Sequence, residues 1–135
     1  MQDFRHLKVW QKSHELTLAM YRLTSAFPRE EVYGLSAQMR SSSSSIPTNL
    51  AEGCGRGTDA ELARFAQISM GSASELEYQC LLARDLGYLD EATYSASVEP
   101  VIEVKRMLAP VIRSLRNTND KGARAAAKGT DSLND

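Results

Sequence analysis

Apolar residues recur every three or four positions along most of the chain, which is the spacing of an amphipathic helix. The sequence contains no alternating run of β-branched residues and no Asn-Gly hairpin turn. The periodic segments and the breaks between them predict helices over about 4–26, 30–57, 58–87 and 90–115. Because the connections are short, we expect an all-α protein, an antiparallel up-down four-helix bundle.

Turn and capping residues mark the ends of the predicted helices. Phe27-Pro28 ends the first helix, since proline cannot continue it. Thr58 and Glu61 have the Thr-x-x-Glu spacing of a capping box and begin the third helix. Gly87 is placed as the glycine just past the end of that helix. Pro47 lies inside the second helix at a cost of about 3 kcal/mol, so tertiary contacts must hold that helix.

The second helix contains five consecutive serines, 41–45, which in isolation resemble a flexible linker. Placed on a helix, its residues separate into two stripes, each about 80° wide, with centres about 100° apart. The apolar stripe consists of Leu35, Met39, Ser43, Ile46 and Leu50. The polar stripe consists of Gln38, Ser42, Ser45, Asn49, Glu52 and Arg56. The pairing of a polar stripe with an apolar one indicates a packed helix that makes specific hydrogen-bonded contacts.

The other helices each show one periodic face. In the first helix the periodic positions are Leu7, Trp10, His14, Ala19, Tyr21 and Leu23. In the third they are Leu62, Phe65, Ser69, Ser72, Leu76, Cys80 and Ala83, and Gly71 would let another backbone approach closely. In the fourth they are Tyr94, Val98, Val101, Lys105, Leu108, Ile112 and Leu115. Residues 1–116 are therefore predicted to form the bundle, and residues 117–135 a disordered C-terminal tail.

Composition limits the class of protein. A chain of 135 residues with 42% hydrophobic and 24% charged residues suffices for one domain with a single core. No apolar run approaches the ~18 residues of a membrane-spanning helix. The N-terminus also lacks the apolar segment of a signal peptide. We therefore expect a cytoplasmic protein with no membrane partner.

Charge is unevenly distributed along the chain. The net charge of −1 argues against a bulk electrostatic attraction to nucleic acid. Residues 1–29 nevertheless carry five basic residues against two acidic ones. Such a segment either forms a basic face once the helices pack or is an ordinary solvated surface, and the second interpretation is favoured.

Candidate catalytic and metal-binding groups are few. Cys54 and Cys80 lack a C-x-x-C spacing and are interpreted as reduced thiols rather than as a disulfide or a metal site. His6 and His14 both lie on the first helix, without the second histidine of a zinc-protease motif. The glycine-rich segment 53–57 follows a helix and lacks Gly-Lys-Ser/Thr, which indicates a helix end rather than a phosphate loop. No cofactor is expected, and a Cys80–His14 pair is the remaining nucleophilic alternative.

An ordered series of motifs resembles a known family. The motifs lie at residues 4–11, 27–28, 33–40, 45–56, 71–76 and 86–89. Spanning about 4–115, they resemble the four-helix-bundle family whose founders are encoded by intervening sequences in bacterial large-subunit ribosomal RNA genes. That family also includes the accessory variability determinants of diversity-generating retroelements. The chain differs in carrying Ser41, where a second arginine commonly follows Arg40, and in its slightly acidic charge.

The resemblance implies a homo-oligomer, a ring-like pentamer, without catalytic activity or a cofactor. For the retroelement members it also implies nucleic-acid binding and association with a reverse transcriptase. The leading hypothesis is therefore a non-enzymatic, self-assembling scaffold or interaction protein. Its predicted packing and subunit contacts are Gln38, Ser42, Ser45, Asn49, Glu52, Arg56, Gly71, Ser72 and Glu75. The alternative is an accessory protein that binds structured RNA or DNA through Arg5, Lys8, Lys12, Arg22 and Arg40 and partners a reverse transcriptase.

Overall fold

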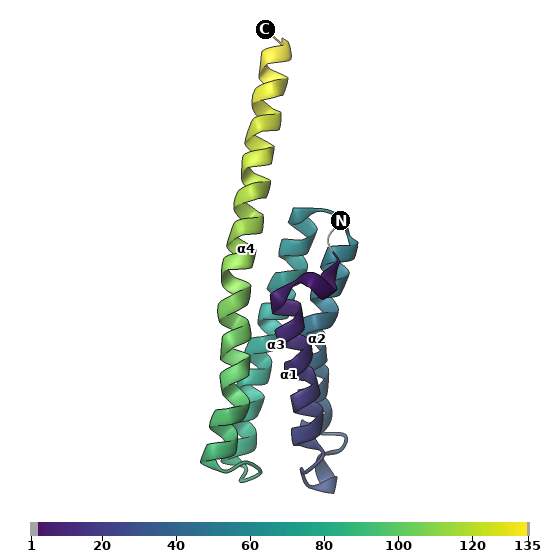
Figure 1. The fold of residues 1–135 in the computed structure, drawn as a ribbon, viewed down its shortest axis with the longest axis vertical. Coiled ribbons are helices and arrows are strands. Elements are labelled where there is room, and N and C mark those ends of the chain that lie inside the picture. The colour runs from purple at the N-terminus through teal and green to yellow at the C-terminus, as the bar shows by residue number, and fades with distance from the viewer. Residues whose placement is uncertain (1–2, 135) are drawn as a thin grey trace.

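The computed structural model describes residues 3–134, with side chains through residue 129. Its elements, in chain order, are η1 (Phe4–His6), α1 (Lys8–Thr24), η2 (Arg29–Glu31), α2 (Leu35–Gly55), α3 (Asp59–Asp85) and α4 (Glu91–Asn134). No strand occurs within residues 3–134. Figure 1 shows α1, α2, α3 and the first part of α4 lying side by side, with α4 continuing well past the other helices. The predicted all-α four-helix bundle is therefore confirmed.

The helices pack in the order of the chain. The α2–α3 contact is the most extensive, followed by α3–α4 and α1–α2, and the contact that closes the bundle between α1 and α4 is the smallest of these four. One core runs through all four helices, and its fully buried large side chains include Leu16, Met39, Leu50, Leu76 and Leu108. All five members of the apolar stripe predicted for the second helix are buried, which confirms that prediction. The serine tract is thus part of a packed helix.

The predicted ends of α3 are also confirmed. The Thr58 hydroxyl accepts a hydrogen bond from the Glu61 backbone N–H at 3.2 Å, which caps the first turn. At the other end, the backbone N–H of Tyr88 donates to the carbonyl of Ala83 at 2.9 Å. Gly87 lies between them with φ +83°, a left-handed conformation that favours glycine. The chain therefore turns sharply from α3 into α4.

The packed face of α1 differs from the one expected. The prediction placed His14 and Tyr21 among the periodic positions, but both side chains are exposed. The buried residues of α1 are Val9, Ser13, Leu16, Thr17, Met20 and Thr24. His14 instead stacks on the half-buried Trp10, at 5.1 Å between ring centroids, and the Tyr21 ring lies under the Arg40 guanidinium. The small polar residues Ser13 and Thr17 face the interior of the bundle in their place.

Pro47 is accommodated inside α2 by a side chain from α1. Proline has no backbone N–H, so the carbonyl of Ser43, four residues earlier, loses its normal helical donor. The hydroxyl of Thr17 donates to that carbonyl at 2.9 Å, in a buried position. It also lies 2.9 Å from the carbonyl of Ser13 in its own helix. The tertiary support that the proline requires is supplied by this contact.

The side chain of Glu31 joins the two loops at one end of the bundle. Its Oε2 accepts a hydrogen bond from the backbone N–H of Leu35 at 2.8 Å, at the start of α2. Its Oε1 accepts one from the hydroxyl of Tyr88, in the α3–α4 turn, at 3.1 Å. The ring of Tyr88 lies 5.4 Å from that of Phe27, between centroids. The α1–α2 and α3–α4 connections therefore meet at this end.

The C-terminal part of α4 extends beyond the bundle (Figure 1). The sequence predicts a disordered tail from residue 117, whereas in the structure α4 continues through Asn134. The described side chains of 117–129 are exposed, so this segment contributes nothing to the core. An existing helix adds residues without a new nucleation cost, and 123–128 contain four alanines, the strongest helix former. We call residues 117–134 the α4 extension.

Candidate interaction surfaces

Serine hydroxyls form hydrogen bonds across the α2–α3 contact. The Ser42 hydroxyl donates to Oε1 of Gln79 at 2.6 Å, in a buried position. The Ser69 hydroxyl donates to the backbone carbonyl of Ile46 at 2.8 Å. The hydroxyls of Ser45 and Ser72 lie 2.9 Å apart, nearer the surface. Small polar side chains thus hold the two helices together where large apolar ones would separate them.

This network continues to the surface. Nδ2 of Asn49 donates to the hydroxyl and the carbonyl of Ser45, at 2.9 Å and 2.8 Å. Nε2 of Gln79 donates to Oε1 of Glu75, an exposed residue, at 3.4 Å. No buried side-chain nitrogen or oxygen of the described residues lacks a partner. The hydrogen bonds therefore run from the interior to the outer edge of the α2–α3 contact.

The remaining residues predicted for this seam face outward. Gln38 and Gly71 are exposed, and a Cβ added at Gly71 would meet nothing within 4 Å. Glu52 and Arg56 form an ion pair of 3.1 Å in which each side chain is about half exposed. These residues leave a polar outer edge along α2 and α3. Its role in subunit contacts remains a prediction.

Sequence reasoning did not identify the exposed apolar residues beside this edge. Ile68 and Tyr78 of α3 are 42% and 55% exposed, and Leu86, the residue just after α3, is 51% exposed. Ile68 and Tyr78 lie at the same helical spacing as Gly71 and Glu75, so all four share the outer face of α3. That spacing was visible in the sequence, but which face meets solvent depends on how the helices pack. We call Ile68, Gly71, Glu75 and Tyr78, together with Gln38 of α2, the outer α2–α3 face.

Gly53 is a packing residue that sequence reasoning also missed. A Cβ added there would lie 2.9 Å from Cβ of Phe65 and 3.0 Å from Cδ1 of Leu62. The absent side chain therefore allows α2 and α3 to approach closely near one end of the bundle. The sequence placed Gly53 only in a helix end, because the partner helix was not known.

Two of the predicted nucleic-acid contacts are engaged within the chain. Arg5 forms an ion pair with Asp3 at 3.3 Å. Nε of Arg40 donates to the hydroxyl of Thr24 at 2.9 Å, and its Nη2 donates to the carbonyl of Tyr21 at 3.2 Å. The Arg40 guanidinium also lies over the Tyr21 ring, 4.9 Å from its centroid. Arg40 therefore stabilises the C-terminal end of α1.

The other predicted cations share one exposed face of α1. Lys8, Lys12 and Arg22 recur at helical spacing along this face, and Glu15 lies among them. Within residues 3–129 the side chains of these three cations form no hydrogen bond and no ion pair. The face borders a groove between α1 and α4. The five predicted cations therefore do not form a single patch.

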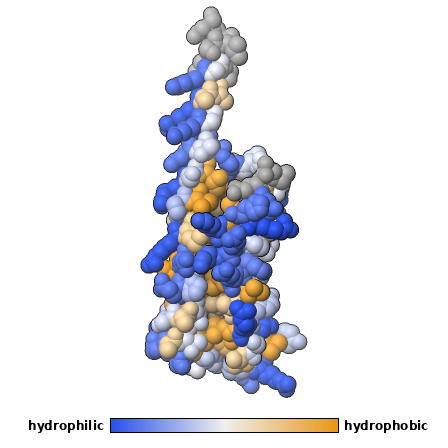
Figure 2. Space-filling view, viewed as in Figure 1, coloured by the Kyte–Doolittle hydropathy of each residue, from blue (hydrophilic) through white to orange (hydrophobic). Residues whose placement is uncertain are grey.

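The groove between α1 and α4 is apolar and open. Its larger hollow, about 640 Å³, is lined by Leu16, Ala19, Met20, Arg22, Leu23, Ala26, Ala92, Thr93, Ala96, Ser97 and Pro100. A second hollow of about 220 Å³ continues along it and includes Lys12, Glu15 and Glu103. Figure 2 shows apolar surface exposed in the lower half of the molecule, on the side where α1 and α4 face the viewer. Small side chains leave the groove open.

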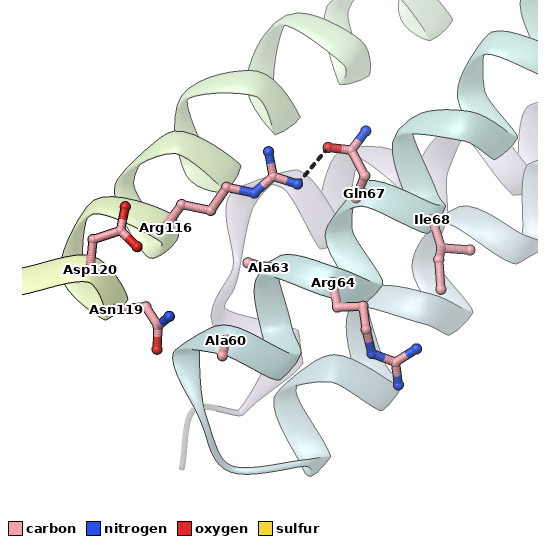
Figure 3. A pocket seen from close by; sticks show the side chains of 8 residues that line it. All are labelled: Ala60, Ala63, Arg64, Gln67, Ile68, Arg116, Asn119 and Asp120. Atoms are coloured by element: carbon pink, nitrogen blue, oxygen red, sulfur yellow. Dashed lines mark hydrogen bonds between the residues drawn. The ribbon is translucent and has the colours of Figure 1, made fainter. Parts of the chain in front are cut away.

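A hollow of about 550 Å³ with a mixed polar and apolar lining lies where α4 leaves α3 (Figure 3). Nη2 of Arg116 on α4 donates to Oε1 of Gln67 on α3 at 3.1 Å. The small side chains of Ala60 and Ala63 leave space on the α3 side of the hollow, and Arg64 extends away from α4 (Figure 3). The hollow thus separates α3 from the end of the bundled part of α4 and from the first turn of the α4 extension, which supplies Asn119 and Asp120 to its lining.

The cysteines are poorly placed for nucleophilic chemistry. Cys54 and Cys80 are both free and buried. Burial, with a smaller contribution from Glu77, raises the pKa of the Cys80 thiol to about 12. Burial also raises the pKa of Cys54. Since the thiolate is the reactive form and His14 is exposed on α1, the two thiols are unreactive at neutral pH.

The described residues hold neither a metal cluster nor a helix that could span a membrane. That part of the chain holds no group of three or more His, Cys, Asp or Glu side chains arranged to bind a metal ion. None of its helices combines the length and the apolar character needed to cross a membrane.

These features define an all-α four-helix bundle with extended helical surfaces. The chain belongs to the 23S rRNA-intervening sequence protein family, whose model matches residues 5–110. It is also similar in fold to a crystal structure described as a protein of unknown function from the S23 ribosomal protein family of Bacteroides thetaiotaomicron. The two share 24% sequence identity with a TM-score of 0.73, over 78% of this chain and 95% of that chain. A comparison with curated proteins found no significant match.

Proposed function

We propose that the protein is a non-enzymatic, self-assembling scaffold that uses the outer α2–α3 face for subunit contacts. The observation that supports this function is the composition of that face. Ile68 and Tyr78 expose large apolar surface beside the open backbone of Gly71. Glu75 and Gln38 provide exposed hydrogen-bonding groups at its border. Apolar centres with polar rims are typical of protein–protein interfaces.

A homopentamer is the proposed oligomeric state, and it rests on the family resemblance. In a five-membered ring each subunit contacts its two neighbours through two different surfaces. Such a head-to-tail contact is called heterologous. The link to accessory proteins of retroelements belongs to the same proposal. It would add a reverse transcriptase as a partner of the assembled ring.

The proposal is tested by measuring the molar mass of wild-type protein and surface variants by light scattering at micromolar concentration. Ile68→Lys places a charge in the outer α2–α3 face and should reduce the mass to that of a smaller species. Leu18→Lys is the matched control, because Leu18 is 44% exposed on α1 and Ile68 is 42% exposed on α3. A monomeric wild type, or equal effects of both substitutions, would refute the proposed surface.

A second candidate function is binding to structured RNA or DNA through α1. It is favoured by the shared exposed face of Lys8, Lys12 and Arg22. Phosphate contacts weaken steeply with salt, so binding should be detectable at about 50 mM salt and decline at higher concentrations. Lys12→Ala combined with Arg22→Ala should reduce affinity and flatten the salt dependence. Absence of binding at low salt would exclude this function for α1.

A further inference from the structure

A hollow of about 450 Å³ lies beside the α1–α2 connection, at the end of the bundle opposite the α4 extension (Figure 1). We call it the α1–α2 hollow. It is formed by the end of α1, the connection itself and the start of α2. We propose that it binds a small organic anion, in which a carboxylate or phosphate group is attached to a compact apolar body. This binding is independent of the subunit contacts proposed above.

The charged side chains that line the hollow are two arginines, Arg29 and Arg40. Arg40 has five N–H groups, and it uses two of them, on Nε and Nη2, for the hydroxyl of Thr24 and the carbonyl of Tyr21. The other three have no acceptor within residues 3–129. In the same range the exposed side chain of Arg29 forms no hydrogen bond or ion pair. Guanidinium groups pair with carboxylate and phosphate oxygens in bidentate geometry, so these free donors suit an oxyanion.

None of the described residues that line the hollow is acidic. Glu30 and Glu31 follow Arg29 in the chain, but neither belongs to the lining. Both oxygens of Glu31 already accept hydrogen bonds, one from the backbone N–H of Leu35 and one from the hydroxyl of Tyr88. The charge within the hollow is therefore positive, which favours an anion.

A buried serine hydroxyl without a partner opens into the hollow. Ser36, in the first turn of α2, is only 5% exposed, and its hydroxyl forms no hydrogen bond within the described residues. In that part of the chain every fully buried side-chain nitrogen or oxygen has a partner. The Ser36 hydroxyl therefore reaches open space, and the space beside it is the hollow that Ser36 lines. Buried polar groups are normally paired, so this hydroxyl is available to hydrogen-bond a ligand.

The other hydroxyls of the lining are already donated within α1. The hydroxyl of Thr24 donates to the carbonyl of Met20 at 2.8 Å. The hydroxyl of Ser25 donates to the carbonyl of Arg22 at 2.6 Å. Ser36 is thus the hydroxyl of the lining whose proton is free, a difference that the experiment below uses.

Apolar side chains complete the hollow and favour an organic ligand. Phe27, Pro28 and Val32 contribute to its lining, and Val32 is 53% exposed. The volume falls within the range of about 300–1,000 Å³ that is typical of small-molecule sites. Such sites combine an apolar lining with a few polar groups that fix the orientation of the ligand. A ligand with an apolar body should therefore bind more tightly than a bare inorganic anion.

Ligand-observed saturation-transfer NMR on the full-length protein tests the site in whatever state of assembly the protein adopts. The probes are phenyl phosphate and benzoate, and benzyl alcohol is their neutral counterpart. At about 50 mM salt we expect saturable binding of at least one anion with a Kd below about 1 mM, and about tenfold weaker binding of benzyl alcohol. The tighter of the two anions identifies the charged group that the site prefers. Inorganic phosphate, added as a competitor, should displace it with about tenfold lower affinity.

Paired substitutions locate the bound anion. Ser36→Ala should raise the Kd about fivefold, whereas Ser25→Ala, which removes a hydroxyl already donated to α1, should leave it unchanged. Arg29→Ala should raise the Kd about tenfold, and Arg22→Ala, which removes an exposed cation outside the hollow, should change it less than about twofold.

Three results would overturn the anion site. The first is the absence of saturable binding by either anion, in which case water serves the free donors of Ser36 and Arg40. The second is equal binding of benzyl alcohol, because the apolar lining alone would then account for the affinity. The third is an equal effect of the two substitutions within either pair, since the anion would then lie elsewhere on the molecule.

Discussion

Replacement of Thr17 by valine should destabilise the bundle because the hydroxyl of Thr17 compensates for Pro47. Valine keeps the β-branched shape but cannot donate to the carbonyl of Ser43, which accepts that hydroxyl at 2.9 Å. The Ser43 residue is fully buried, so water cannot replace the lost donor without a structural change. A buried carbonyl without a partner costs about 1–3 kcal/mol. We expect Thr17→Val to lower the free energy of unfolding by about 2 kcal/mol.

A double-mutant cycle with Pro47→Ala isolates this cause. An alanine at this position has a backbone N–H, which donates to the Ser43 carbonyl as in an ordinary helix. In that background Thr17→Val should cost about 1 kcal/mol less than it does with proline present, and this difference is the coupling between the two sites. Urea unfolding followed by circular dichroism provides the four free energies.

Ser25→Ala, at the C-terminal cap of α1, is the control for loss of a hydroxyl that bonds to α1. Ser25 is exposed, and its hydroxyl donates only within its own helix, to the carbonyl of Arg22 at 2.6 Å and that of Tyr21 at 3.2 Å. Its removal should change stability by less than about 0.5 kcal/mol. Equal costs of Thr17→Val in the wild-type and Pro47→Ala backgrounds would show that the hydroxyl does not compensate for the proline.

Three further predictions concern local packing and ionisation. Gly53→Ala should lower the unfolding free energy, measured by urea unfolding, by about 1–3 kcal/mol, because the added Cβ would overlap side chains of α3. Gly71→Ala is the control: its Cβ would meet open space, so the substitution should raise the unfolding free energy by about 0.5–1 kcal/mol. Similar effects of the two substitutions would contradict the close approach of α2 and α3 at Gly53. Gly87→Ala should reduce the thermal midpoint through a cost of about 1 kcal/mol, because φ there is +83°, and an unchanged midpoint would argue against this turn. The pKa of Cys80, raised to about 12 from an ordinary value of 9.0, keeps the folded thiol neutral while the unfolded thiol ionises above about pH 9. Wild-type stability should therefore fall by up to about 1.4 kcal/mol per pH unit between those values, and Cys80→Ala should lack this contribution when unfolding is compared at about pH 8 and pH 10.

The sequence was sufficient to predict a feature where the feature depends on the residues of one helix alone. The phase of Leu35, Met39 and Leu50 placed the serine tract inside α2, and all three are buried. Capping at Thr58 and the turn at Gly87 were equally readable, because they depend on neighbouring residues alone. These are the features for which local chemistry and tertiary packing impose the same choice.

The sequence was insufficient where a residue serves another helix. Thr17 is buried against α2, where its hydroxyl bonds to the carbonyl that Pro47 leaves without a helical donor, and this role is not apparent from the pattern of α1. The space at Gly53 exists for Phe65 and Leu62 of α3. For the candidate surface, the serines of the seam were located correctly on α2, but the exposure of Ile68 required knowledge of how α3 packs. The assembly role of these residues stays a prediction.

The two hydrogen bonds of Glu31 have different consequences for the order of folding. The bond from Leu35 closes a loop of only four residues and can form together with α2. The bond from Tyr88 spans 57 residues, so we expect it to form late, once the α1–α2 and α3–α4 connections have met. A contact made after the transition state influences the unfolding rate and leaves the folding rate nearly unchanged. We therefore expect the Tyr88 hydroxyl to contribute to the lifetime of the native bundle rather than to the speed of its formation.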